Sequence, residues 1–86
     1  RRPGHERIAV APKPVRIAYD DGTVTHRNII DVSISGASID MRDRPAIGSE
    51  IMVGQLAAKV VRHHERGIGV EFAYVQQIDR IREDFG

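Results

Sequence analysis

Short runs of alternating apolar and polar residues, separated by turn signals about every 8–12 residues, constrain the fold of this chain most strongly. A strand places successive side chains on opposite faces, so each alternating run predicts a strand with one buried face. The predicted strands are 15–19, 23–30, 37–42, 51–53, 56–61 and 68–72, with turns at 20–22, 54 and 65–67 and a loop at 43–50. Six short strands with this spacing are typical of an antiparallel barrel or sandwich, a mainly β fold.

The C-terminal segment has a different period. Its apolar residues Tyr74, Ile78, Ile81 and Phe85 are spaced 4, 3 and 4 positions apart, which places them on one face of a helix. We therefore expect a short helix that closes one end of the barrel or packs on its side. The chain is predicted to form one domain over 1–86, with a flexible basic arm at 1–7, the β-barrel at 8–73 and the helix at 74–85.

Composition excludes several classes of protein. With 86 residues the chain fits one small domain with a thin core, so a large internal substrate cavity is hard to stabilise. The absence of cysteine excludes disulfides, thiolate metal sites and cysteine nucleophiles. A small secreted domain without disulfides is unusual, and no apolar run reaches the ~18 residues of a membrane span, so we expect a cytoplasmic setting without membrane insertion. Because the first residue is not Met, we expect the chain to be a processed product or an excised domain.

The charge is nearly balanced in total but uneven along the chain. Thirteen Lys and Arg residues face twelve Asp and Glu residues, which argues against a nucleic-acid or membrane-surface binder of strongly basic composition. Residues 1–30 carry six of these cations against three acids, and most of the cations are arginine. Arginine suits forked recognition of phosphates and guanine edges, although an arginine-rich composition also follows from a GC-rich genome.

Three residues after the second predicted strand could recognise a guanine nucleotide. Asp31 and Ser33 are two positions apart, so on an extended backbone they point to the same side. A carboxylate can accept hydrogen bonds from guanine N1–H and N2–H together, and a hydroxyl can donate or accept beside it. Gly36 permits a sharp turn or the close approach of a flat ligand. Each residue also has a structural interpretation, as a turn residue or a bulge glycine.

Several segments, taken in order, resemble the PilZ domain family. They are the N-terminal arginines that end at Arg7, DVSISG at 31–36, which fits the pattern Asp/Asn-x-Ser-x-x-Gly, Pro45 and Gly48 in a loop, and RGIGVEF at 66–72, which is similar to the family's last strand. The resemblance covers Arg1 to Ala73. It implies a six-stranded antiparallel β-barrel with a short C-terminal helix.

The resemblance also implies a function: a non-enzymatic receptor for the bacterial second messenger cyclic di-GMP. By this analogy Arg2 and Arg7, with Arg1 as a secondary candidate, grip phosphates and guanine edges, while Asp31, Ser33 and Gly36 form the opposite wall. Binding would order the arm against the barrel and relay a signal to a neighbouring domain or effector protein. If the parent is a membrane protein, the domain is expected at the cytoplasmic face of the inner membrane. No cofactor is expected besides the ligand.

One departure from the family pattern keeps an alternative open. The family's arm usually has Arg-x-x-x-Arg, but Pro3 stands four positions before Arg7, and the nearest arginine is Arg2. The alternative is therefore a PilZ-like protein-interaction domain that has lost nucleotide binding. A third hypothesis, a barrel that binds single-stranded nucleic acid, is disfavoured because four aromatic residues leave no stacking platform.

Other motifs are less specific. The adjacent residues His63 and His64 point to opposite faces of a strand, so we expect no metal site. No nucleophile elbow is visible, so we expect no enzyme activity. The pair Gly67 and Gly69 is interpreted as a tight turn before the last strand.

Overall fold

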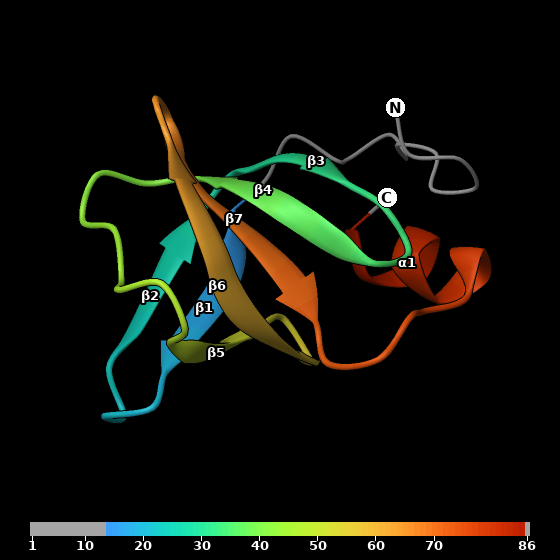
Figure 1. Ribbon diagram of the computed structural model, residues 1–86. Helices are drawn as coiled ribbons and strands as arrows, with labels where there is room; N and C mark the ends of the chain where they lie inside the picture. The colour runs from blue at the N-terminus through green and yellow to red at the C-terminus, as the bar shows by residue number, and fades with distance from the viewer. Residues whose placement is uncertain (1–13, 86) are drawn as a thin grey trace.

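The computed structural model describes residues 14–85 and shows a curled antiparallel sheet with one helix (Figure 1). The elements are β1 (Val15–Tyr19), β2 (Val24–Arg27), β3 (Ile29–Val32), β4 (Gly36–Asp40), β5 (Glu50–Val53), β6 (Leu56–His64), β7 (Gly67–Phe72) and α1 (Ile78–Phe85). The core consists mainly of Ile, Val and Ala side chains from the inner face of the sheet, as the alternation predicts. The mainly β fold with a C-terminal helix is therefore confirmed. No helix of the described residues is long and apolar enough to cross a membrane.

The sheet has seven strands in the order β2-β1-β5-β6-β7-β4-β3, and all pairs are antiparallel. Its two outermost strands, β2 and β3, are consecutive in the chain and separated by the single residue Asn28. The sheet must therefore curl until its two ends meet at this residue, where the N–H of Asp40 donates to the Asn28 carbonyl at 2.9 Å. The predicted strand 23–30 is thus divided, because its first half pairs with β1 and its second half with β4.

The turn between β1 and β2 lies where Asp20-Asp21-Gly22 predicts it. Gly22 has a φ of 91°, a left-handed conformation that favours glycine. Its N–H donates to the Tyr19 carbonyl at 3.1 Å, and the carboxylate of Asp21 accepts from the Thr23 N–H at 2.8 Å. The local sequence therefore determines this hairpin.

The helix packs against one end of the curled sheet through two side chains (Figure 1). Ile81 is completely buried, and Phe85 stacks on Phe72 with ring centroids 6.4 Å apart. The helix begins at Ile78, four residues later than the spacing predicts, and Tyr74 lies outside it and is 79% exposed. The expectation of a helix from residue 74 fails because the preceding segment is tied to the sheet: the Gln76 N–H donates to the Ile34 carbonyl at 2.7 Å.

Candidate functional site

The predicted ligand residues Asp31 and Ser33 lie at the end of β3, on the outer face of the sheet. Between them Val32 is completely buried in the core, so the alternation of the strand directs its two neighbours outward. Both side chains are half-buried. Their role in ligand binding stays a prediction.

Ser33 also has a structural task, because it caps the turn that leads into β4. Its N–H donates to the Gly36 carbonyl at 2.8 Å, and its hydroxyl oxygen accepts from the Ser35 N–H at 3.3 Å. The hydroxyls of Ser33 and Ser35 lie 3.2 Å apart. The hydroxyl also donates to the Gly36 carbonyl, over a long 3.5 Å. The turn interpretation and the ligand interpretation of Ser33 are compatible, since the hydroxyl oxygen can accept a further hydrogen bond.

Gly36 is required by the sheet rather than by a turn. It does not belong to the left-handed glycines of residues 14–85, which are Gly22, Gly48 and Gly54. A Cβ at Gly36 would overlap the carbonyl oxygen of Val70 and lie 3.3 Å from the Cα of Glu71. A glycine is therefore needed at this position because the backbone of β7 lies so close to it.

The register of the sheet extends the candidate site across three further strands. Asp31 on β3 pairs with Ser38 on β4, Ser38 pairs with Gly69 on β7, and Gly69 pairs with Arg62 on β6. We call these four residues the cross-strand row. Directly paired residues lie on the same face, so the row crosses the outer face from the edge of β3 to β6. Ser38, Gly69 and Arg62 were not predicted from the sequence.

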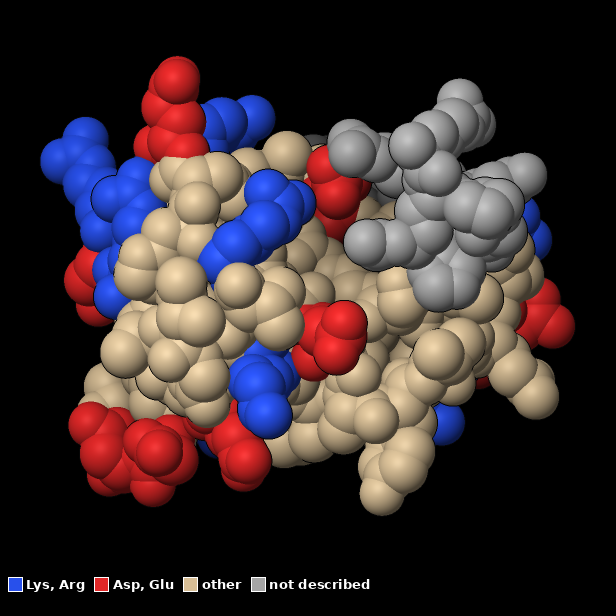
Figure 2. Space-filling view, in the orientation of Figure 1, with Lys and Arg blue, Asp and Glu red and all other residues tan. Residues whose placement is uncertain are grey.

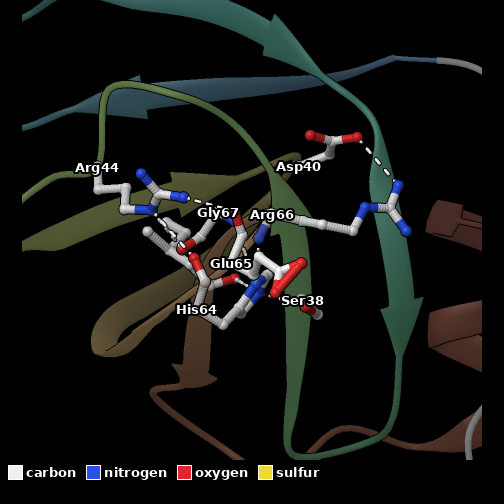
Figure 3. A network of polar contacts seen from close by, with 8 residues as sticks. Ser38, Asp40, Arg44, His64, Glu65, Arg66 and Gly67 are labelled. Carbon is white, nitrogen blue, oxygen red and sulfur yellow. Dashed lines mark hydrogen bonds and ion pairs between the residues drawn. The ribbon is translucent and has the colours of Figure 1, made fainter.

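Ser38 is the buried polar residue of this row, with 7% of its surface exposed. Its hydroxyl lies 2.7 Å from Nε2 of His64. Nδ1 of His64 accepts from the N–H groups of Arg66 and Gly67 at 3.2 and 3.1 Å, so the ring carries its proton on Nε2 (Figure 3). This N–H faces the Ser38 hydroxyl and also the Ile68 carbonyl, which lies 3.1 Å away. The Ser38 hydroxyl can then donate its own proton to a ligand group.

The tip of the β6–β7 hairpin is fixed by two arginines (Figure 3). The guanidinium of Arg44 donates to the carbonyls of His64, Glu65 and Gly67 at 3.1, 2.8 and 3.1 Å. Arg66 forms an ion pair with Asp40 on β4 at 3.1 Å. These contacts hold the hairpin in place, and with it the His64 ring beneath Ser38.

The family model of the PilZ domain matches residues 2–84. The chain belongs to the PilZ family. This is a family of cyclic di-GMP receptors, and PilZ domains are generally binding modules rather than enzymes. A comparison with curated proteins finds no match.

The arginines of the predicted arm, Arg1, Arg2 and Arg7, lie outside the described residues, as does Pro3. Their role in this PilZ domain stays a prediction. On the face seen in Figure 2, basic and acidic side chains are interspersed on a largely uncharged surface. Within residues 14–85 no group of three or more His, Asp or Glu side chains could hold a metal ion.

The PilZ domain also has a hollow of about 550 Å³ formed by β1, β5, β6 and β7. Asp20, Glu50 and Glu71 line it together with the single cation Lys59, and none of the predicted ligand residues from the described chain does so. Three carboxylates against one ammonium disfavour an anion. The candidate nucleotide site is therefore the outer face at the cross-strand row and not this hollow.

Proposed function

We propose that this PilZ domain is a non-enzymatic receptor that binds cyclic di-GMP on the outer face of its sheet. The observation that supports this most directly is the placement of Asp31 and Ser33 side by side at the edge of β3, in the motif that the family resemblance assigns to the ligand. The carboxylate of Asp31 matches the paired N1–H and N2–H donors of a guanine edge, and the hydroxyls of Ser33 and Ser38 supply further hydrogen bonds.

The arm would complete the site from the other side. In this proposal Arg2 and Arg7, assisted by Arg1, grip the phosphates and guanine edges through forked hydrogen bonds. Gly36 permits the close approach of β4 to β7. In this way it keeps the β3–β4 turn, and with it Asp31 and Ser33, beside the sheet. Closure of the arm over a bound dianion would be an order-forming switch.

The turn at 33–36 is connected by hydrogen bonds to the segment that precedes the helix. The carbonyls of Ser35 and Ile34 accept from the N–H groups of Phe72 and Gln76 at 2.8 and 2.7 Å. Between those two donors, Tyr74 and Val75 expose 79% and 66% of their surfaces. This connection supports a relay in which a ligand at Asp31 alters the exposed segment, which a neighbouring domain or effector protein would contact in the bacterial cytoplasm or at the cytoplasmic face of the inner membrane.

The same exposed segment favours a second candidate function. A PilZ domain that has lost nucleotide binding through Pro3 would still present Tyr74 and Val75 to a protein partner. Large exposed apolar side chains beside each other are a feature of interaction surfaces. The second candidate is therefore a protein-interaction domain.

Titration calorimetry with cyclic di-GMP distinguishes the two functions. We expect binding by the purified domain, and a loss of affinity of about tenfold or more in Arg7→Ala and in Asp31→Ala, because each removes a hydrogen-bonding charge worth roughly 1.5–3 kcal/mol. The matched control is Asp20→Ala, which removes an exposed carboxylate in the β1–β2 turn and should bind like the wild type. A flat trace from correctly folded wild-type protein would reject the receptor and favour the interaction domain.

A further inference from the structure

The outer face of β7 has no side chain of its own where the cross-strand row passes over it. The inward side chains of β7 are Ile68, Val70 and Phe72, which are all buried in the core. The outward positions alternate with these and begin with two glycines, Gly67 and Gly69. A flat ligand on this face therefore meets no β7 side chain between Ser38 on β4 and Arg62 on β6.

The side chain of Arg62 lies over this part of β7. A Cβ added to Gly69 would be 2.7 Å from Nε, 2.9 Å from Cγ and 3.2 Å from Cζ of the Arg62 side chain. The guanidinium thus lies over Gly69 on β7, although Arg62 starts from β6. Adjacent strands are about 4.8 Å apart, so the Arg62 guanidinium over β7 lies about two strand spacings, roughly 10 Å, from the backbone of Asp31.

The donors of Arg62 are not used by the described part of the fold. Within residues 14–85 its guanidinium makes no hydrogen bond and no ion pair. The two arginines that fix the nearby hairpin differ in this respect, since Arg44 binds three carbonyls and Arg66 binds Asp40. Arg62 is therefore a forked donor placed on the candidate face with its hydrogen-bonding capacity intact.

We infer that Arg62 is a ligand-binding residue of the barrel itself, which binds a phosphate of the cyclic dinucleotide whose guanine lies at Asp31 and Ser33. This inference rests on the proposed function. The base edge and the phosphate of a guanine nucleotide lie on opposite sides of its ribose. A guanine bound at the β3 edge can therefore place a phosphate over Ser38 and β7, the next residues of the cross-strand row. There the guanidinium can bind two phosphate oxygens.

The first test is calorimetry with cyclic di-GMP on Arg62→Gln. We expect an affinity loss of about tenfold or more with an unchanged melting temperature, since Arg62 makes no bond within the described fold. The matched control is Arg16→Gln, which removes the same charge from an exposed position on β1, in the other half of the sheet. Equal affinity in Arg62→Gln and the wild type would overturn the inference.

The second test moves the guanidinium without removing it. In Gly69→Ala the atoms that meet the new Cβ belong to the flexible Arg62 side chain, which must swing away from β7. We expect an affinity loss similar to that of Arg62→Gln, and no further loss when the two changes are combined, because both remove the same contact. Additive losses would show that Gly69 acts independently of Arg62 and would contradict the assignment.

The outcomes separate this inference from the proposed function. If Asp31→Ala loses affinity while Arg62→Gln does not, the receptor function holds and the role of Arg62 is rejected. If the folded wild-type protein does not bind cyclic di-GMP, both are rejected.

Discussion

Replacing Gly36 by alanine tests whether this motif glycine is required by the fold. The added Cβ would come well inside 3.0 Å of the Val70 carbonyl oxygen, a separation that real Cβ atoms essentially never show. The obstructing atom is backbone, and its residue pairs with Ala37 in the β4–β7 ladder. No side-chain rotation can relieve the overlap, so β4 and β7 must move apart.

The magnitude follows from the kind of obstacle. Overpacking typically costs about 1–3 kcal/mol, and we expect Gly36→Ala to reach the upper end, about 3 kcal/mol, because two paired strands must shift. A domain of this length has a free energy of unfolding of about 4–13 kcal/mol, so the loss is a large fraction of it. At roughly 4–8 °C per kcal/mol, the melting temperature should fall by about 12–24 °C.

Thermal unfolding followed by circular dichroism measures this loss, and Gly69→Ala is its matched control. Both changes add one methyl group to a glycine on the outer face, but at Gly69 the new atom meets the movable side chain of Arg62. We expect the control to change the free energy of unfolding by less than about 1 kcal/mol. A Gly36→Ala variant that melts with the wild type or with the control would refute the assignment of Gly36 to strand packing.

Two further predictions concern the helix and the first hairpin. Phe85→Ala removes a ring that is 2% exposed and stacked on Phe72, so the free energy of unfolding in urea should fall by about 3–5 kcal/mol, and a loss below about 1 kcal/mol would contradict the packing. Hydrogen bonds from the side chain and the N–H of Thr23 lower the pKa of Asp21 in the folded state. This contribution to stability is present above the ordinary aspartate pKa of about 3.9 and is lost as the pH falls through the lowered value, so the melting temperature of the wild type should drop more than that of Asp21→Asn between about pH 5 and 2. An NMR titration that places the Asp21 midpoint at or above the ordinary value would reject this.

Local features of the sequence predicted the strands and the first hairpin, but not the pairing of strands that are distant in the chain. The Asp20-Asp21-Gly22 turn depends on neighbouring residues, so its hairpin could be predicted from the sequence. The division of the predicted strand 23–30 at Asn28 depends on which strands lie at each end of the curled sheet, and those strands come from distant parts of the chain. Which distant strands pair is decided by tertiary contacts and not by neighbouring residues.

The two errors near the C-terminus have the same origin. The helical spacing includes Tyr74, but the chain bends at residues 73 and 74, and the Gln76 N–H is bonded to the carbonyl of Ile34 in the β3–β4 turn. Gly67 and Gly69 were interpreted as a tight turn, yet both lie within β7, where a Cβ on Gly67 would overlap the backbone of Ile39 on β4. In each case a contact with a segment distant in the chain outweighs the local preference.

The candidate site could be predicted only where it is continuous in sequence. Asp31 and Ser33 belong to a short motif, and their outward direction follows from the alternation around Val32. Ser38 and Arg62 join them through pairing across β4, β7 and β6, which no local pattern shows. One local pattern in the sequence did point to this part of the site. Glycine alternates with Ile68 and Val70, which indicates a strand whose outer face lacks side chains there.

At the β3–β4 turn the same residues stabilise the fold and belong to the candidate site. This determines which substitutions can measure ligand binding without a change in stability. Ser33 caps the turn and Gly36 admits β7, so changes at either position alter stability as well as any binding surface. Arg62 makes no hydrogen bond or ion pair within residues 14–85. A methyl group added at the neighbouring Gly69 is accommodated when the Arg62 side chain moves away. A loss of affinity at Arg62 or Gly69 without a change in melting temperature therefore reports on the ligand alone, whereas a loss at Gly36 does not.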